Sequence, residues 1–198
     1  IAKSESGIIQ YQDQLGELVL PEPSILGDHQ LYNISTSIAA SRKIFNIKDE
    51  YIRNGIKNIS LKARLEEIKS GKLKNIARNN KLVIDGGHNI SASLSIANWI
   101  KNQNEEVNLI VGMMKDKEHV EFIKAFENIV NSITLIDIPN QDGAISKEDF
   151  KKKLDNSKLN LKLSNNIKES IKSLSKNENT IILCVGSLYL AGEILSLN

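Results

Sequence analysis

The sequence predicts an α/β fold: a Rossmann-like, mostly parallel sheet covered by helices on both faces, preceded by a smaller separate part. From about Ser60 onward, short apolar runs alternate with segments in which apolar residues recur at helical spacing. The runs are continuously apolar, which is typical of strands buried on both faces of a parallel sheet. The preceding residues lack this alternation, so we expect a boundary that separates residues 1–59 from residues 60–198.

The first part is expected to contain a β-hairpin and two helices. Short β-like runs at 7–13 and 16–23, the second of which is ended by Pro21 and Pro23, flank a polar turn and predict the hairpin. Apolar residues keep helical spacing after Asp28, a favourable N-cap, and the segment 47–59 predicts a second, shorter helix. These elements alone would make a poor hydrophobic core, so we expect them to pack on residues outside this chain or on the second part.

The second part is expected to alternate between strands and helices. The predicted strands are 81–85, 107–112, 132–139 and 180–186. The predicted helices are 90–100, 120–130, 150–154, 167–174 and the segment that follows residue 186.

The composition argues against several classes of protein. The 26 basic and 24 acidic residues give a net charge of +2 without a basic stripe, so we expect no nucleic-acid partner. No apolar run approaches the roughly 18 residues of a membrane span, so no membrane partner is expected either. The lone cysteine, Cys184, allows no internal disulfide and fits a reducing, cytoplasmic location. The first residue is Ile1 rather than Met, so we expect the start of the natural chain to be missing.

The segment LVIDGGHNISA, residues 82–92, is the first of three polar strand ends. In open α/β sheets, ligands bind outside the carboxyl ends of the strands. Asp85 could accept hydrogen bonds from a ribose or an amine, and His88 could meet a phosphate oxygen at the start of the next helix. In the alternative interpretation, Asp85 caps that helix and His88 is an ordinary surface residue. Spacing alone leaves both interpretations open.

Two further strand ends carry polar residues. Lys115 and Lys117 follow the strand that closes at Gly112, and a lysine there could hold a carboxylate as a point charge. Ser187 follows Gly186 at the end of the last strand and offers a hydroxyl. A solvated loop and a simple glycine turn would explain the same patterns without function.

The sequence lacks several common motifs. Neither a Gly-x-Gly-x-x-Gly fingerprint nor a P-loop occurs, and the missing fingerprint disfavours a nicotinamide dehydrogenase. The histidines, His29, His88 and His119, lack the spacing of a zinc site. We therefore assign no metal ligands to this chain.

The motifs taken together resemble a known family. They are GDHQLYN (27–33), Arg64 in LKARLE, DGGHN (85–89), GMMKDK (112–117) and GSLYLAG (186–192). In this order they resemble folylpolyglutamate synthase and dihydrofolate synthase, which are ATP-dependent Mur-type amino-acid ligases. The resemblance implies that residues 1–59 are the C-terminal tail of a truncated ATP-binding (Mur-ligase-like central) domain, and that residues 60–198 are the Rossmann-like C-terminal ligase domain. It also explains the missing P-loop, which would lie in the absent N-terminal part.

The resemblance implies a reaction and its participants. ATP with Mg²⁺ would phosphorylate a carboxylate of folate or dihydropteroate, and L-glutamate would attack the acyl phosphate. The missing N-terminal domain of the same protein would be the other partner, so we expect this chain to be inactive alone. The alternatives are the C-terminal domain of a cell-wall Mur ligase and a non-catalytic Rossmann-like binding module. The DGGHN and GSLYL motifs favour the folate branch.

The resemblance also implies roles for individual residues. Asp85 and His88 would be catalytic. The ATP-binding residues would be His29, Gln30, Asn33, Arg64 and Asp85, and the glutamate-binding residues would be His88, Lys115, Lys117 and Ser187. The sequence departs from the family pattern in three places: Gly87 stands where alanine is frequent, Ile90 where proline is frequent, and the run before Arg64 reads SLK where Trp-Pro-Gly is common.

Overall fold

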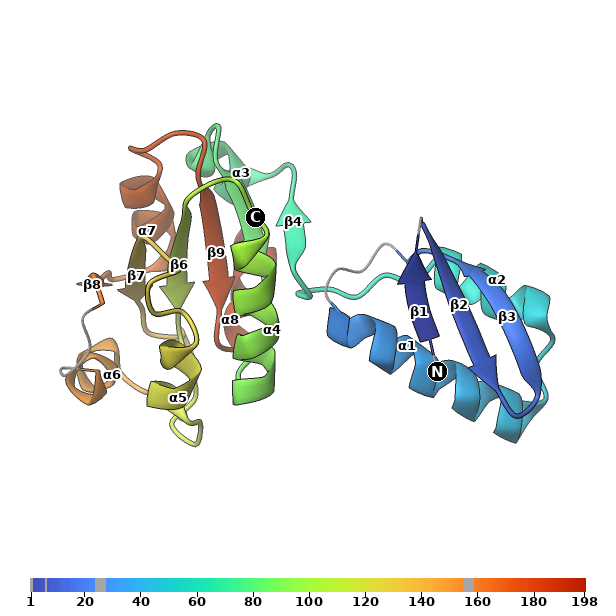
Figure 1. Ribbon diagram of the computed structural model, residues 1–198. Helices are drawn as coiled ribbons and strands as arrows, with labels where there is room; N and C mark the ends of the chain where they lie inside the picture. Colours follow the sequence, from blue (N-terminus) through green and yellow to red (C-terminus); the bar gives the residue numbers. More distant parts are fainter. Residues whose placement is uncertain (1, 6, 24–27, 155–158) are drawn as a thin grey trace. The chain divides into compact units, whose positions relative to one another are not determined.

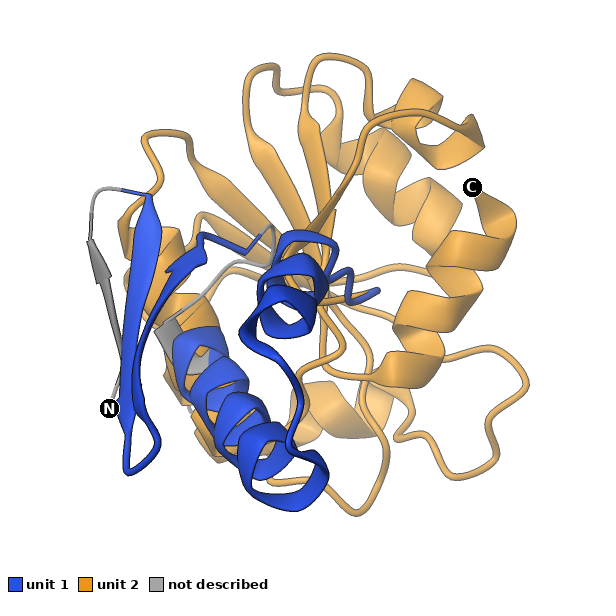
Figure 2. Ribbon diagram, turned by 90° about the vertical axis from the view of Figure 1, so that its right-hand side faces the viewer, with its two compact units in different colours: residues 1–62 blue, residues 63–198 orange. Residues whose placement is uncertain are grey.

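The chain separates into two compact units, residues 1–62 and residues 63–198, in a computed structural model (Figure 2). The structure describes residues 2–5, 7–23, 28–154 and 159–198. The first unit ends at Lys62 and the second begins at Ala63, so the division falls slightly later than the predicted boundary between residues 59 and 60.

The first unit packs an antiparallel sheet against two helices. Strand β2 (Ile8–Asp13) pairs with both β1 (Ala2–Glu5) and β3 (Gly16–Pro21), and helices α1 (Asp28–Phe45) and α2 (Asp49–Lys57) follow. The predicted hairpin and both helices are therefore confirmed, and β1 is an addition. The predicted N-cap role of the Asp28 side chain lies outside the described residues.

The expectation that this unit lacks a core of its own is wrong. Alternate residues of β2 and β3 point to one face, where they meet the apolar stripes of α1 and α2. The buried cluster consists of Ile9, Tyr11, Leu18, Leu20, Ile34, Ile38, Ile52 and Ile56. An ion pair at the edge of the sheet joins Arg42 Nη1 to Asp13 Oδ1 at 2.8 Å.

The second unit has the predicted mostly parallel sheet (Figure 1). Its strand order is β4-β5-β9-β6-β7-β8, and every neighbouring pair is parallel except β4 with β5. The strands are β4 (Glu66–Ile68), β5 (Lys81–Ile84), β6 (Val107–Val111), β7 (Ser132–Leu135), β8 (Leu161–Leu163) and β9 (Ile181–Val185). The predicted central strands β5, β6, β7 and β9 are confirmed, whereas the edge strands β4 and β8 were not predicted.

Helices cover both faces of this sheet, as expected for strands that are apolar throughout. One face carries α4 (Ile90–Lys101), α5 (His119–Lys124) and α6 (Lys147–Lys153). The other face carries α3 (Lys72–Ala77), α7 (Ile167–Leu174) and α8 (Leu188–Leu197) (Figure 1). Among the described helices of the second unit, the sequence failed to predict only α3. No helix in the described part of the chain is both long and apolar enough to cross a membrane.

Residue Asn198 holds the start of α3 from the far end of the chain. Its Oδ1 accepts hydrogen bonds from the amides of Leu73 (3.1 Å) and Lys74 (3.2 Å), and its main-chain oxygen accepts one from Lys72 (2.8 Å). A side chain on Gly71 would overlap Asn198, which explains why glycine stands there. These bonds satisfy amides that a helix start leaves without partners.

The topology brings three strand ends to one edge of the sheet. Because β5, β9 and β6 are adjacent and parallel, their carboxyl ends point the same way. Asp85, Gly186 and Gly112 directly follow these strands. The chain then enters α4 and α8 through side-chain caps: Asn89 Oδ1 accepts from the Ala92 amide at 2.9 Å, and Ser187 Oγ accepts from the Tyr189 amide at 3.1 Å.

Candidate active site

The Asp85 carboxylate is buried, with 4% of the residue exposed, and is bound by two main-chain amides. Oδ1 accepts a hydrogen bond from Gly87 N at 2.6 Å, and Oδ2 accepts one from Leu65 N at 2.9 Å. The interpretation that Asp85 caps α4 is wrong, because Asn89 is the cap. Asp85 instead ties the end of β5 to the segment that carries Arg64.

Arg64 is held in a tight loop beside the end of β5. The residues on either side of it, Ala63 (φ 53°) and Leu65 (φ 48°), are both left-handed, a backbone conformation that costs about 1–3 kcal/mol for a residue with a side chain. Three hydrogen bonds compensate: Ala63 N to Glu66 Oε2 (2.8 Å), Gly86 N to Ala63 O (2.9 Å), and Leu65 N to Asp85. The loop before Arg64 departs from the family pattern, yet these bonds fix the arginine next to the Asp-Gly-Gly turn.

The two glycines after Asp85 allow close packing. A Cβ on Gly86 would overlap the Leu188 side chain and would lie 3.5 Å from Arg64 Nη1. A Cβ on Gly87 would lie 2.7 Å from Ala92 Cβ and 2.8 Å from Asp85 Oδ1. The alanine that is frequent in the family at position 87 would therefore require the start of α4 to shift in this chain.

His88 is half-buried and lies within electrostatic range of the turn after β6. Its Nδ1 lies 3.0 Å from Gly86 O, so in the neutral ring Nδ1 carries the hydrogen and Nε2 the lone pair. A hydrogen bond from Lys117 lowers the pKa of Asp116, and the charge of His88 lowers it further. His88 and the Asp116–Lys117 pair thus interact electrostatically across the end of β9, the strand that lies between β5 and β6.

The two candidate lysines point to different partners. Lys117 Nζ pairs with Asp116 Oδ2 at 2.8 Å, on the side of His88. Lys115 Nζ instead donates to the main-chain oxygen of Asp142 at 2.9 Å, in the segment after β7. Of the two lysines, Lys117 is the one paired with the carboxylate that the charge of His88 reaches.

Gly186 joins the three strand ends. Its amide donates to Gly87 O at 3.0 Å, and its φ of 105° suits glycine alone. A Cβ at this position would lie 2.7 Å from Gly112 O. Ser187, which is 3% exposed, follows directly, so Arg64, Asp85, His88 and Ser187 gather around one edge of the sheet rather than on separate surfaces.

The remaining predicted site residues belong to the first unit. Gln30 is buried on α1, and its Oε1 accepts a hydrogen bond from Asn33 Nδ2 at 3.2 Å. Asn33 itself is exposed near the start of that helix. The side chain of His29 lies outside the described residues. The assignment of these residues to ATP stays a prediction.

Among the described residues, no group of three or more His, Cys, Asp or Glu side chains could hold a metal ion. The buried carboxylate of Asp85 is already bound by two amides, as described above. The described residues of this chain therefore do not by themselves supply the ligands of a Mg²⁺ site.

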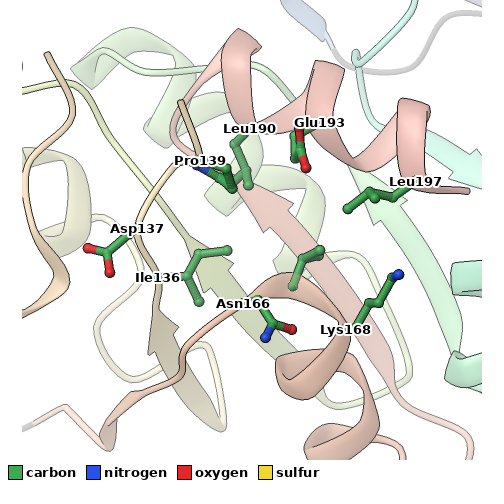
Figure 3. A pocket seen from close by; sticks show the side chains of 9 residues that line it. Ile136, Asp137, Pro139, Asn166, Lys168, Leu190, Glu193 and Leu197 are labelled. Atoms are coloured by element: carbon green, nitrogen blue, oxygen red, sulfur yellow. The ribbon is translucent and has the colours of Figure 1, made fainter. Parts of the chain in front are cut away.

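A hollow of about 280 Å³ lies near the end of β7, between α7 and α8 (Figure 3). Its floor is apolar and includes Ile136, Leu190 and Leu197, and Lys168 and Glu193 lie at its rim. None of the predicted site residues lines it. Leu190 also packs near Gly112, since a Cβ on that glycine would lie 3.4 Å from Leu190 Cδ2. The hollow thus lies near the edge of the sheet that carries the predicted site residues, but it is lined by other residues.

The fold and the residues at its strand ends define a Rossmann-like α/β domain in which Asp-Gly-Gly-His and Gly-Ser turns form the carboxyl edge of the sheet. The chain belongs to a family described as "Dihydrofolate synthetase, C-terminal domain", which matches residues 67–197.

Curated relatives agree with the family. The chain is 26% identical over 181 residues to a dihydrofolate synthase/folylpolyglutamate synthase of Bacillus subtilis, which covers 86% of this chain and 39% of the relative. It is 24% identical over 192 residues to a folylpolyglutamate synthase of Lacticaseibacillus casei, covering 93% of this chain and 42% of the relative. The chain therefore spans less than half the length of these relatives.

Solved structures share the fold. A Mycobacterium tuberculosis folylpolyglutamate synthase complexed with ADP and AMPPCP matches all of this chain and 46% of its own, with a TM-score of 0.79 and 19% identity. A bifunctional folylpolyglutamate synthase/dihydrofolate synthase with Mn, AMPPNP and L-glutamate bound matches 97% of this chain and 44% of its own, with a TM-score of 0.76 and 18% identity. At these identities the likeness establishes the fold alone.

Proposed function

We propose that this chain is part of an enzyme that joins L-glutamate to folate, to dihydropteroate or to both, at the expense of ATP. Residues 60–198 are its C-terminal ligase domain, and residues 1–59 are the end of its ATP-binding domain. Membership in the family supports this proposal. The observation that carries it is the gathering of Arg64, Asp85, His88 and Ser187 at one edge of the sheet.

The proposed reaction has two steps. The γ-phosphate of ATP is transferred to the carboxylate, which gives an acyl phosphate and ADP. The glutamate amine then attacks the acyl carbon, so a C–N bond forms, the C–O bond to phosphate breaks, inorganic phosphate leaves and the nitrogen loses a proton. An uncharged amine is needed for the attack, and a charged group is needed to stabilise the phosphates.

The residues of the strand ends suit these needs. Arg64 is a permanent, planar cation that can bind phosphate oxygens with two donors. Asp85 holds Arg64 in place through Leu65 N. His88 carries its lone pair on Nε2 when Nδ1–H donates to Gly86 O, so it can take the proton of the glutamate ammonium group.

Glutamate carboxylates require a cation and hydrogen-bond donors. Lys117 pairs with Asp116, which the charge of His88 reaches, so we assign Lys117 the main role in binding glutamate and propose Lys115 and Ser187 as further contacts of the same substrate. Gln30, Asn33 and His29 of the first unit are proposed for the adenine. A divalent ion such as Mg²⁺ would be held by groups outside the residues described here. The partners would be these small molecules and the rest of the same protein, in the cytoplasm.

The proposal predicts that Arg64→Ala abolishes ligation. In the full-length protein, removing the cation that meets the phosphates should lower kcat/KM by at least about a hundredfold, an effect typical of a lost transition-state contact. The measurement is ATP-dependent incorporation of labelled L-glutamate, with dihydropteroate and tetrahydrofolate tested separately as acceptors.

Arg78→Ala is the matched control. Arg78 is exposed, precedes β5 and so lies at the opposite edge of the sheet. Its loss should leave ligation unchanged. A full-length protein that ligates glutamate to neither acceptor, or an Arg64→Ala variant as active as Arg78→Ala, would favour a non-catalytic module instead. This 198-residue chain alone should show no ligation.

A further inference from the structure

His119, the first residue of α5, is buried with 3% of its surface exposed and has a partner at each ring nitrogen. Its Nε2 lies 2.9 Å from Met114 O, and its Nδ1 lies 3.2 Å from Lys153 Nζ on α6. An ammonium group can only donate, so Nδ1 must be the acceptor and Nε2–H must donate to Met114 O. The ring also packs edge-on against Phe150, with centroids 5.0 Å apart.

The surroundings keep this imidazole neutral. Burial lowers the pKa of His119 below its ordinary value, and the charge of Lys153 lowers it further. The hydrogen bond with Met114 and the acids Asp116 and Glu121 act in the opposite direction without reversing the shift. A neutral ring with one fixed tautomer donates a hydrogen bond in one direction. An apolar residue of the same size could not donate this bond.

The acceptor, Met114 O, belongs to the turn that carries the candidate lysines. On one side, this turn is strapped to the segment after β7: Ile145 N donates to Met113 O at 3.0 Å, and Lys115 N donates to Gly143 O at 2.8 Å. On the other side, Lys117 N donates weakly to Met114 O at 3.4 Å, and His119 supplies the shorter bond to the same oxygen. His119 therefore supplies the shorter of the two hydrogen bonds that hold the part of the turn carrying Lys117.

We propose that His119 is a positioning residue that sets the Met114–Lys117 turn and thereby holds Lys117 opposite His88, where the glutamate carboxylate is to bind. The proposal rests on the proposed function in one respect, the assignment of glutamate to Lys117. The chain of hydrogen bonds from Lys153 through His119 to Met114 O is supported by the measured distances and does not depend on the proposed function.

Steady-state kinetics of the full-length protein tests the role in binding. His119→Phe keeps an aromatic ring against Phe150 but removes the donor, and the loss of one buried hydrogen bond should raise the KM for L-glutamate about tenfold. The KM for ATP and kcat should change less than about twofold, because Lys117 is not assigned to the phosphates. His119→Gln places an amide nitrogen near the former Nε2 and should restore most of the loss.

Phe150→Leu is the control for packing. It disturbs the same apolar contacts without touching the bond to Met114 O. It should lower the melting temperature and leave the KM for glutamate unchanged. An unchanged KM in His119→Phe, or an equal rise in all three variants, would overturn the positioning role.

Nuclear magnetic resonance separates this inference from the proposed function. Met113 and Met114 both lie in the turn, so ¹³C-methyl labelling of methionine in the full-length protein, with these two signals assigned by substitution, reports on the turn. The Met114 methyl signal should move in His119→Phe and stay in place in His119→Gln and Phe150→Leu. If these shifts occur in a full-length protein that does not ligate glutamate, His119 positions the turn but the assignment of glutamate to Lys117 is wrong.

Lys153→Met provides a variant that should fold in any case, because Lys153 is exposed. Without the ammonium group, Nδ1 loses its donor, so the imidazole ¹⁵N signals should change from those of one tautomer to an average of two. Unaltered imidazole signals, or an unmoved Met114 methyl in His119→Phe, would refute the arrangement.

Discussion

At the end of β5, a buried carboxylate holds the turn at residues 85–88, whereas at the end of β6 the charged side chains of the turn at residues 113–117 lie at the surface. The Asp85 carboxylate is bound by Leu65 N and Gly87 N. The backbone of the second turn is held by main-chain bonds to the segment after β7 and by His119, while its lysines are in an ion pair or on a main-chain oxygen. The charged group of the first turn is thus preformed in the core, while those of the second can move at small cost, as groups that must admit and release a substrate need to do.

The largest effect is expected where both turns meet, at Gly186. Gly186→Ala would put a side chain at φ 105° and a Cβ 2.7 Å from Gly112 O, a main-chain atom that cannot rotate away. We expect a loss of about 3 kcal/mol or more in the free energy of unfolding. Urea unfolding of the full-length protein checks this.

Gly192→Ala serves as the control for Gly186→Ala, because a Cβ there has open space inside α8. It should leave stability the same or raise it slightly. Equal stabilities for the two variants would mean that the three strand ends are not locked together at Gly186.

A smaller effect is expected for Asp85→Asn, which directly tests the contrast between the two turns. The substituted amide has a single acceptor oxygen, so it would turn a donor toward Leu65 N or Gly87 N. Because hydrogen bonds to buried charged groups are worth about 1.5–3 kcal/mol each, we expect a loss of about 2 kcal/mol and a displaced Arg64. Thermal unfolding gives the stability, and the KM for ATP reports on Arg64.

The same change at the β6 turn is the matched comparison. Asp116→Asn removes only an exposed ion pair with Lys117, and such pairs contribute little to stability. The unfolding temperature of this variant should match that of the unmodified protein. A comparable loss in both variants would remove the distinction between a preformed and an adaptable turn.

The smallest effect is a pH dependence that belongs to the β6 turn. Burial and the charge of Lys153 lower the pKa of folded His119, so the unfolded chain binds a proton more readily than the folded one as the pH falls below about 6.5. The contribution of His119 to stability is therefore fully present above the unfolded pKa and decreases as the pH falls toward the folded pKa.

Unfolding at pH 5.5 and 7.5 measures this dependence. The unmodified protein should lose more stability between these values than His119→Phe does, while Asp116 and Glu121 remain present in both. Identical pH profiles for the two proteins would mean that His119 is not neutral in the fold.

The sequence was informative where burial alone decides structure. The continuous apolar runs of β5, β6, β7 and β9 are recognisable without knowledge of their neighbours, and the parallel order then places Asp85 and Ser187 at one edge. Strand β4, Glu-Glu-Ile, could not be recognised, because its pairing with β5 is a tertiary contact and its composition is charged. Helix α3 is short and depends on a cap from a residue 125 positions away.

The candidate site was likewise predictable only where its residues follow a recognisable strand. Asp85 and His88 follow a strong strand signal, so the carboxyl-edge rule finds them. The function of His119 could not be read from the sequence, because its partner Lys153 lies 34 residues further along the chain. A histidine in DKEHVEF looks like an exposed residue at the start of a helix, and only the tertiary structure shows that it is buried.

The bonds from Asn198 to the start of α3 have a practical consequence for anyone who expresses this protein. A protein that lacks Asn198 would lose the caps of three amides at 72–74 and have a looser α3, although that helix lies 125 positions earlier in the sequence. A shortened version should therefore keep residue 198.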